Sequence, residues 1–228
     1  MIEYDLIRSD RRTISLQITP EGRVLVRAPK RCAKGFIDRF VLEKENWIHV
    51  HQKKVLAALE DREEFRLKDG GSLMFCGEPY RVILTRERRL SLDLQNKTLT
   101  LQDQPISQLT PGVRRMYQRG GLPWIEQRLK YWAEIMRITY GKVNISTAVR
   151  RWGSCSVNGD IHISWLLLFA PPKAIDYVLI HELCHRVEFN HSPAFWALVA
   201  RYMPDYQEQK QVLRSLHSQL FSQGWSTK

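Results

Sequence analysis

No apolar segment of the 228-residue chain approaches the roughly 20 residues that a membrane-spanning helix needs. The first ten residues, MIEYDLIRSD, are charged and lack the apolar centre of a secretory signal. We therefore expect a globular protein of the cytoplasm, with no membrane partner.

Cysteine is scarce and scattered. Its four positions contain no C-x-x-C pair, which argues against a disulfide framework and against a zinc ribbon made from cysteine alone. The chain also lacks internal repeats, low-complexity tracts and the glycine-rich loop that cradles phosphates in many nucleotide-binding proteins.

Acidic residues are outnumbered, with 24 Asp and Glu against 35 Lys and Arg, so the net charge is +11. A basic surface attracts polyanions such as nucleic acids and nucleotides. The excess is spread along the chain, because residues 1–100 carry 20 basic and 15 acidic groups and the rest carry 15 and 9. A dispersed, solvated surface accounts for this pattern, so the charge permits such partners without indicating one.

The N-terminal part alternates between strand and helix patterns. Residues 1–30 alternate polar and apolar side chains on both sides of Pro20-Glu21-Gly22, which predicts a β-hairpin. Apolar residues then recur at helical spacing from about Ala33 to Leu59. Short strands are expected at Leu73–Phe75, Tyr80–Leu84, Leu90–Leu94 and Leu99–Leu101.

A domain boundary is predicted near residues 103–112, where proline, glycine and aspartate cluster, so we divide the chain into residues 1–105 and 106–228. In the second part, Gly120-Gly121-Leu122-Pro123 predicts a break or kink in any helix that begins near Val113. Other expected elements are helices at Trp124–Ile138, from Pro171-Pro172, from Ser192-Pro193 and over Asp205–Phe221, and a strand pair turning at Asn158-Gly159.

The most informative segment is His181-Glu182-Leu183-Cys184-His185, an HExxH motif. On a helix, residues four apart lie about 40° apart around the axis, so His181 and His185 project side by side and can bind one Zn²⁺. Glu182 lies beside them, where it can hold a metal-bound water and accept its proton. The rest of this helix is apolar, and unpartnered polar groups there would be costly, so the pattern predicts a catalytic zinc site.

A catalytic zinc needs a third protein ligand. His191 can reach the metal if the helix ends soon after Glu188 and Asn190 provides a left-handed turn. Glu188 is a competitor on the same helical face, although a straight helix would carry it about 10 Å along the axis from His181. A carboxylate elsewhere in the chain is the remaining alternative for the third ligand. We take the other four histidines as non-ligands: His49, His51, His162 and His217.

Together with the surrounding residues, the motif resembles the YgjP-like metallopeptidase-fold family, whose relatives are the SprT and WLM zinc peptidases. The resemblance is tight over about residues 140–200, and residues 1–60 resemble that family's N-terminal hairpin and helix. It is carried by Arg151-Trp-Gly-Ser-Cys155, Ala170-Pro-Pro, Ile175-Asp-Tyr-Val178, His181-Glu-Leu-Cys-His185, Asn190-His-Ser192 and Phe195-Trp196.

The resemblance implies an α+β fold with a zincin-like catalytic core in residues 106–228. It also implies that His181, His185 and His191 bind zinc and that Glu182 is the base. The three histidines are spaced as in metzincins too, but Glu188 stands where those enzymes have a turn-forming glycine. The assignment of His191 therefore depends on the YgjP-like resemblance.

The segment Arg150–Cys155 has two interpretations. In zincin-like enzymes a strand edge beside the metal helix can bind the substrate backbone by strand addition, and Arg151 could stabilise negative charge on a substrate oxygen. Alternatively, the segment is a structural turn in which Trp152 packs in the core and Gly153 permits a bend.

We predict a zinc-dependent hydrolase, first of all a metallopeptidase that acts on peptides or proteins through zinc-bound water activated by Glu182. One alternative, motivated by the positive charge, is a metal-dependent nucleotide phosphohydrolase. Another, motivated by charge and by the SprT relationship, is a DNA-associated protease or binding protein, although no DNA-binding motif is recognisable.

Overall fold

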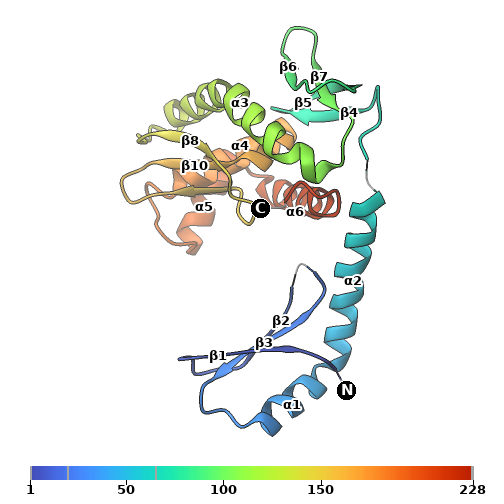
Figure 1. Ribbon diagram of the computed structural model, residues 1–228. Helices are drawn as coiled ribbons and strands as arrows, with labels where there is room; N and C mark the ends of the chain where they lie inside the picture. Colours follow the sequence, from blue (N-terminus) through green and yellow to red (C-terminus); the bar gives the residue numbers. More distant parts are fainter. Residues whose placement is uncertain (1, 20, 65, 227–228) are drawn as a thin grey trace. The chain divides into compact units, whose positions relative to one another are not determined.

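The computed structural model describes residues 2–19, 21–64 and 66–226, apart from the side chains of residues 58–64. The chain forms two compact units, residues 1–64 and 65–228, and each is described by itself (Figure 1). Pro20, part of the predicted hairpin turn, lies outside the described residues. Among the described helices, none is long and apolar enough to cross a membrane.

The first unit is a three-stranded sheet with two helices. Its strands are β1 (Asp5–Ser9), β2 (Ser15–Ile18) and β3 (Val24–Pro29), and β3 lies between the other two. β3 is antiparallel to β2, which confirms the predicted hairpin, and parallel to β1. Alternate side chains of β3 are buried and form this unit's core with apolar residues of the helices: Val24, Val26, Ala28, Ile37, Val41 and Ile48.

Two helices, α1 (Lys34–Glu43) and α2 (Glu45–Glu64), replace the single helix that the spacing suggested from Ala33 to Leu59. The chain leaves helical geometry at Lys44, whose N–H donates to the carbonyl of Val41. Both helices contribute side chains to the same small core, so the break allows both of them to pack with strand β3.

The second unit begins with a four-stranded sheet in the order β4-β5-β7-β6. The strands lie at the places that the sequence predicted: β4 (Ser72–Phe75), β5 (Glu78–Thr85), β6 (Ser91–Asp93) and β7 (Thr98–Gln102). β5 and β7 run parallel and the other neighbours antiparallel.

One long helix, α3 (Ile106–Met136), follows this sheet. The prediction of a break at Gly120–Pro123 is wrong, because the helix continues through both Pro111 and Pro123. The two glycines serve packing instead. A β-carbon on Gly120 would lie 2.7 Å from Leu92, and one on Gly121 would lie 2.7 Å from Leu168. A larger residue at either position would therefore force these leucine side chains to move.

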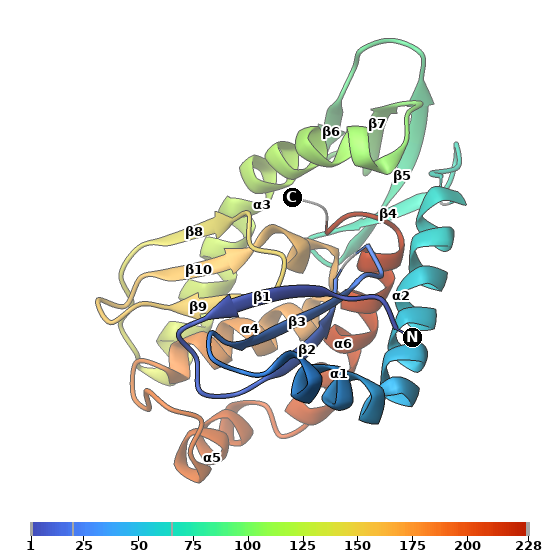
Figure 2. The same cartoon turned by 60° about the horizontal axis from the view of Figure 1, so that its bottom comes forward.

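The remainder of the second unit combines a small sheet with a short 3₁₀ helix and three α-helices. β8 (Val143–Ser146), β10 (Ile161–Ser164) and β9 (Gly153–Cys155) lie side by side in that order, and β9 pairs antiparallel with β10 across the predicted turn (Figure 2). The helices follow: the short 3₁₀ helix η1 (Trp165–Phe169), then α4 (Pro172–Cys184), α5 (Pro193–Tyr202) and α6 (Tyr206–Ser222).

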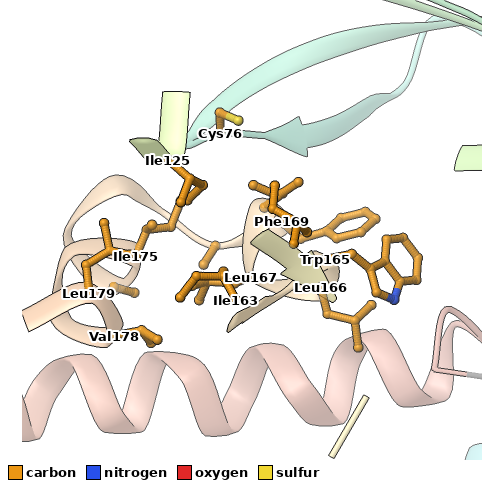
Figure 3. Packing of buried hydrophobic residues seen from close by; sticks show 14 of the residues in the cluster. Cys76, Ile125, Ile163, Trp165, Leu166, Leu167, Phe169, Ile175, Val178 and Leu179 are labelled. Carbon is orange, nitrogen blue, oxygen red and sulfur yellow. The ribbon is translucent and has the colours of Figure 1, made fainter. Parts of the chain in front are cut away.

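A single hydrophobic core fills the second unit. Figure 3 shows side chains of α3, β10, η1 and α4 packed together, among them Ile125, Ile163, Trp165 and Leu179, all fully buried. Buried residues of the four-stranded sheet belong to the same cluster. Residues 66–105 therefore pack with the later residues in one unit. The boundary at residue 105, which separates an N-terminal part from a catalytic domain by function, stays a prediction.

An ion pair joins α3 to α4. The Arg128 guanidinium donates to both carboxylate oxygens of Asp176, a side chain that is only 8% exposed. We expect Arg128→Ala to lower the free energy of unfolding by about 2 kcal/mol, because it leaves the buried Asp176 carboxylate without its partner. The loss is limited because the Arg128 side chain is 35% exposed, so water can partly replace it. Lys130→Ala, which removes a solvent-exposed pair with Glu134 on the same helix, should change it by less than about 0.5 kcal/mol. Urea denaturation of both variants tests this, and equal losses would contradict it.

Candidate metal centre

Helix α4 carries the HExxH motif. Pro171 and Pro172 open it as predicted, since proline is tolerated in a first helical turn. Residues 174–180 and 182–184 of the helix are all buried, and Figure 3 shows Ile175, Val178 and Leu179 within the core. Cys184 is buried and does not belong to the histidine cluster. The motif therefore sits at the C-terminal end of a helix that is fixed along its whole length.

The helix ends earlier than the sequence suggested. It stops at Cys184, and His185 already occupies the capping position. The N–H of Glu188 donates to the carbonyl of Cys184 (2.9 Å) and closes the turn. Asn190 is not in the left-handed region, so that part of the prediction is wrong. Its side chain instead accepts a hydrogen bond from the N–H of Ser192 (3.2 Å) and turns the chain toward α5.

Because the chain turns back at once, His191 reaches the two histidines of the helix. One ring nitrogen from each of His181, His185 and His191 lies within 4.8 Å of the other two. The Nε2 atoms of His181 and His191 are 3.1 Å apart. Glu188 is not part of this group, which is the candidate metal cluster among the described residues.

Surrounding contacts fix the orientation of these rings. His185 Nδ1 donates to the carbonyl of Glu188 (3.1 Å), which leaves Nε2 of that ring free as a ligand. The buried ring of Phe195 lies between 4.6 and 4.9 Å from all three imidazoles, centroid to centroid. Trp196 stacks on His191 at 5.5 Å. Both aromatic residues stand on α5, whose start is capped by Ser192.

The electrostatic surroundings favour neutral imidazoles. Burial, reinforced by the charges of His185, His191 and Lys210, lowers the pKa of His181 to about 3. Burial also lowers the pKa of His185, against the effect of the Glu188 carbonyl. Neutral imidazole is the form that binds a metal.

Glu182 is almost fully buried, with 4% of its surface exposed, and it lies against strand β9. A β-carbon on Gly153 would lie 2.5 Å from Glu182 Oε1, so only glycine leaves room for the carboxylate at this place. Burial raises the pKa of Glu182 to about 7, while the positive charge of Arg151 acts in the opposite direction. Gly153 thus has a more specific role than the bend that its sequence context suggested.

The donor set fits a zinc ion. Two nitrogens bound tetrahedrally to one zinc at roughly 2.0–2.1 Å each lie about 3.3 Å apart, close to the 3.1 Å between His181 and His191. The other ring nitrogen of His181, Nδ1, is buried and has no hydrogen-bond partner among the described residues, so this ring lacks the orienting contact that His185 makes with Glu188. Three imidazoles without a thiolate or carboxylate are typical of a catalytic rather than a structural zinc site.

The structure thus brings together three of the five residues that the sequence singled out, His181, His185 and His191. Glu182 follows His181 on the helix and lies against Gly153, and Arg151 lies within electrostatic reach of Glu182. Sequence reasoning missed the tight contact of Gly153, the carbonyl of Glu188 and the aromatic packing of Phe195. A signal for Gly153 was present, because it follows Arg151-Trp152 in the segment already suspected of lying beside the metal helix.

The chain is similar to known metallopeptidases. One solved structure similar to the chain is the metallopeptidase zymogen abylysin of Pyrococcus abyssi, with 25% sequence identity over 42% of this chain and 94% of that chain, and a TM-score of 0.38. The search for similar curated proteins found no match. The YgjP-like metallopeptidase domain matches residues 12–216, which supports the predicted α+β fold with its zincin-like core. Since the match covers most of the sequence, the chain belongs to the YgjP-like metallopeptidase family.

Proposed function

We propose that this protein is a zinc-dependent peptidase in which His181, His185 and His191 hold the metal and Glu182 is the general base. The convergence of three imidazole nitrogens within 4.8 Å, in a chain with a metallopeptidase domain, carries the proposal. When bound, zinc supplies a Lewis acid that acidifies water and polarises a carbonyl oxygen. The family assignment favours peptide substrates over the nucleotide and DNA-associated alternatives.

Glu182 accepts the proton of the attacking water at its carboxylate and passes it to the leaving amine. Its position supports this role, because it is adjacent to His181 in the motif and its carboxylate is held against the backbone of Gly153. Water reaches this carboxylate poorly, so a proton that it has accepted stays available for the leaving group.

Strand β9 orients the substrate in this proposal. It pairs with β10 on one side and has no strand partner on the other among the described residues, so an extended peptide can add to its free edge. The peptide would then run past Gly153 and Glu182. The exposed Arg151, just before the strand, would stabilise negative charge on a substrate oxygen.

A metal-removal experiment tests the proposed function. Protein purified without a metal-affinity tag should cleave an unfolded substrate such as casein, lose this activity after dialysis against a chelator, and regain it with one equivalent of zinc. Absence of cleavage by the zinc-loaded protein, across a mixture of unfolded proteins and peptides, would contradict the peptidase proposal.

Gly153→Ala tests the contact that positions the base. The new methyl group collides with Glu182 Oε1 and displaces the carboxylate, so we expect kcat to fall by about 100-fold with zinc still bound. Asn158→Ala, at the exposed turn of the same hairpin, is the control for general damage to this sheet. An equal loss of kcat in both variants, or none in Gly153→Ala, would argue against the positioning role.

We also place the protein in the cytoplasm. All four cysteines belong to the described residues and are free thiols, which is typical of a reducing compartment. Residues 106–228 remain our proposed catalytic domain, because they contain every residue assigned above to metal binding, base catalysis or substrate orientation.

A further inference from the structure

A second feature of the catalytic unit is a pocket of about 720 Å³ lined by three arginines. It is formed by one residue of α3 and by the loop that joins β8 to β9. The lining residues are Arg114, Thr147, Ala148, Val149, Arg150 and Arg151.

The arginines of this pocket are not neutralised. No ion pair or hydrogen bond within the described part of the chain involves the guanidinium of Arg114, Arg150 or Arg151. Arg151 also acts electrostatically on Glu182, whose carboxylate is buried against Gly153. Three arginines without an ion-pair partner line one hollow, so their like charges repel one another and a bound anion would relieve this repulsion.

The loop that carries two of these arginines is held in place. Buried Ser164 donates through its hydroxyl to the carbonyl of Ala148 (2.6 Å), and His217 Nε2 hydrogen-bonds to the carbonyl of Val149 (3.1 Å). The N–H of Ser164 also donates to the carbonyl of Trp152 (2.8 Å). The pocket is therefore largely pre-formed, and binding need not order the loop first.

Helix α3 brings the third arginine to the same place. Gln118 donates to the carbonyl of Ile145 at the end of β8 (2.7 Å). Arg114 lies one turn earlier on the same face of the helix, so it projects toward the loop after β8.

The pocket stands beside the proposed path of the substrate. Arg151 is two residues before Gly153, the residue in contact with Glu182, and an extended chain advances roughly 3.3 Å per residue. A peptide on the free edge of β9 would thus bring a group within a few residues of the cleaved bond to the arginines. The planar guanidinium matches a carboxylate through paired hydrogen bonds, and Ala148 and Val149 offer apolar surface to an aliphatic stem.

We propose that the pocket of Arg114, Arg150 and Arg151 binds a carboxylate of the peptide substrate and makes the enzyme selective for acidic peptides. The carboxylate belongs either to a Glu or Asp side chain or to the peptide's C-terminus. This inference rests on the proposed peptidase function and names the substrate class of that site.

Binding to the zinc-loaded Glu182→Gln variant tests the pocket separately from catalysis. The probes are matched peptides: one with Glu, the same peptide with Gln, and each with a free or an amidated C-terminus. We expect about tenfold tighter binding of the peptide that carries the recognised carboxylate. If replacing Glu with Gln removes the preference, the pocket binds a side-chain carboxylate. If amidation removes it, the pocket binds the C-terminal carboxylate.

The double variant Arg114→Ala/Arg150→Ala, in the same Glu182→Gln background, should lose this preference. Arg114→Lys should keep part of it, because the charge remains without the paired hydrogen bonds. Arg115→Ala is the matched control, since Arg115 is exposed, follows Arg114 on α3 and does not line the pocket. It should bind like the parent variant.

Several results would overturn the proposal. These are equal binding of acidic and neutral peptides, no peptide binding at all, a preference that survives the double variant, and inorganic phosphate or a nucleoside triphosphate binding where peptides do not. Failure of the peptidase proposal has a different signature, namely selective binding of the acidic peptide to the inactive variant with no cleavage by the wild-type protein.

Discussion

Glu182→Gln is expected to lower kcat by a factor of about 10²–10⁴, the usual contribution of a general acid–base group. Glutamine has nearly the same shape as glutamate and fits the same space beside Gly153. Its amide cannot accept a proton from water, so the variant should keep its fold and its zinc while it loses turnover. The measurement is kcat on a cleaved peptide, together with zinc content and circular dichroism.

Glu188→Gln provides the matched control for this substitution. Glu188 lies in the turn after the motif and contributes its backbone carbonyl to His185, an interaction that the substitution preserves. It should retain activity within about threefold. If Glu182→Gln retained activity to the same degree, Glu182 would not be the base.

The second large effect is expected from His191→Ala. Loss of a group that only hydrogen-bonds to a metal ligand already costs roughly 10- to 100-fold in metal affinity, so loss of a direct ligand should exceed about 100-fold. Competition with a chromogenic zinc chelator measures the affinity. Peptidase activity at limiting zinc should fall in parallel.

Glu188→Ala separates the two candidates for the third ligand. Its backbone carbonyl still accepts from His185 Nδ1, so the zinc affinity should stay within a few-fold of the wild-type value. A large loss of zinc in Glu188→Ala and a small loss in His191→Ala would reverse the assignment. It would also mean that the turn after α4 rearranges around the metal.

Much of the fold could be predicted from local patterns. The hairpin at residues 15–29, the four strands between residues 72 and 102, and the proline starts of α4 and α5 each have a short-range signal. Other features depend on tertiary packing, which no local pattern contains. Propensity alone places a break at Gly120–Pro123, but Leu92 and Leu168 pack against the two glycines and the helix continues.

The candidate site likewise combines features that are local in the sequence with features that depend on tertiary packing. Helical periodicity predicted that His181 and His185 project side by side, and their ring nitrogens do lie close together, because this spacing is local. The approach of His191 depends on where α4 ends, and that end lies nearer the motif than the sequence suggested. The fit of Glu182 to Gly153 and the pocket at Arg114 join segments far apart in the sequence, so they could be recognised only in three dimensions.

Elemental analysis of protein purified without a metal-affinity tag tests whether the three histidines hold a catalytic zinc. We expect about one zinc per chain in the wild-type protein and almost none in the folded His181→Ala/His185→Ala double variant. A folded wild-type protein that contains no zinc and takes up none when it is added, or a double variant that keeps its zinc, would show that these histidines do not form a zinc site.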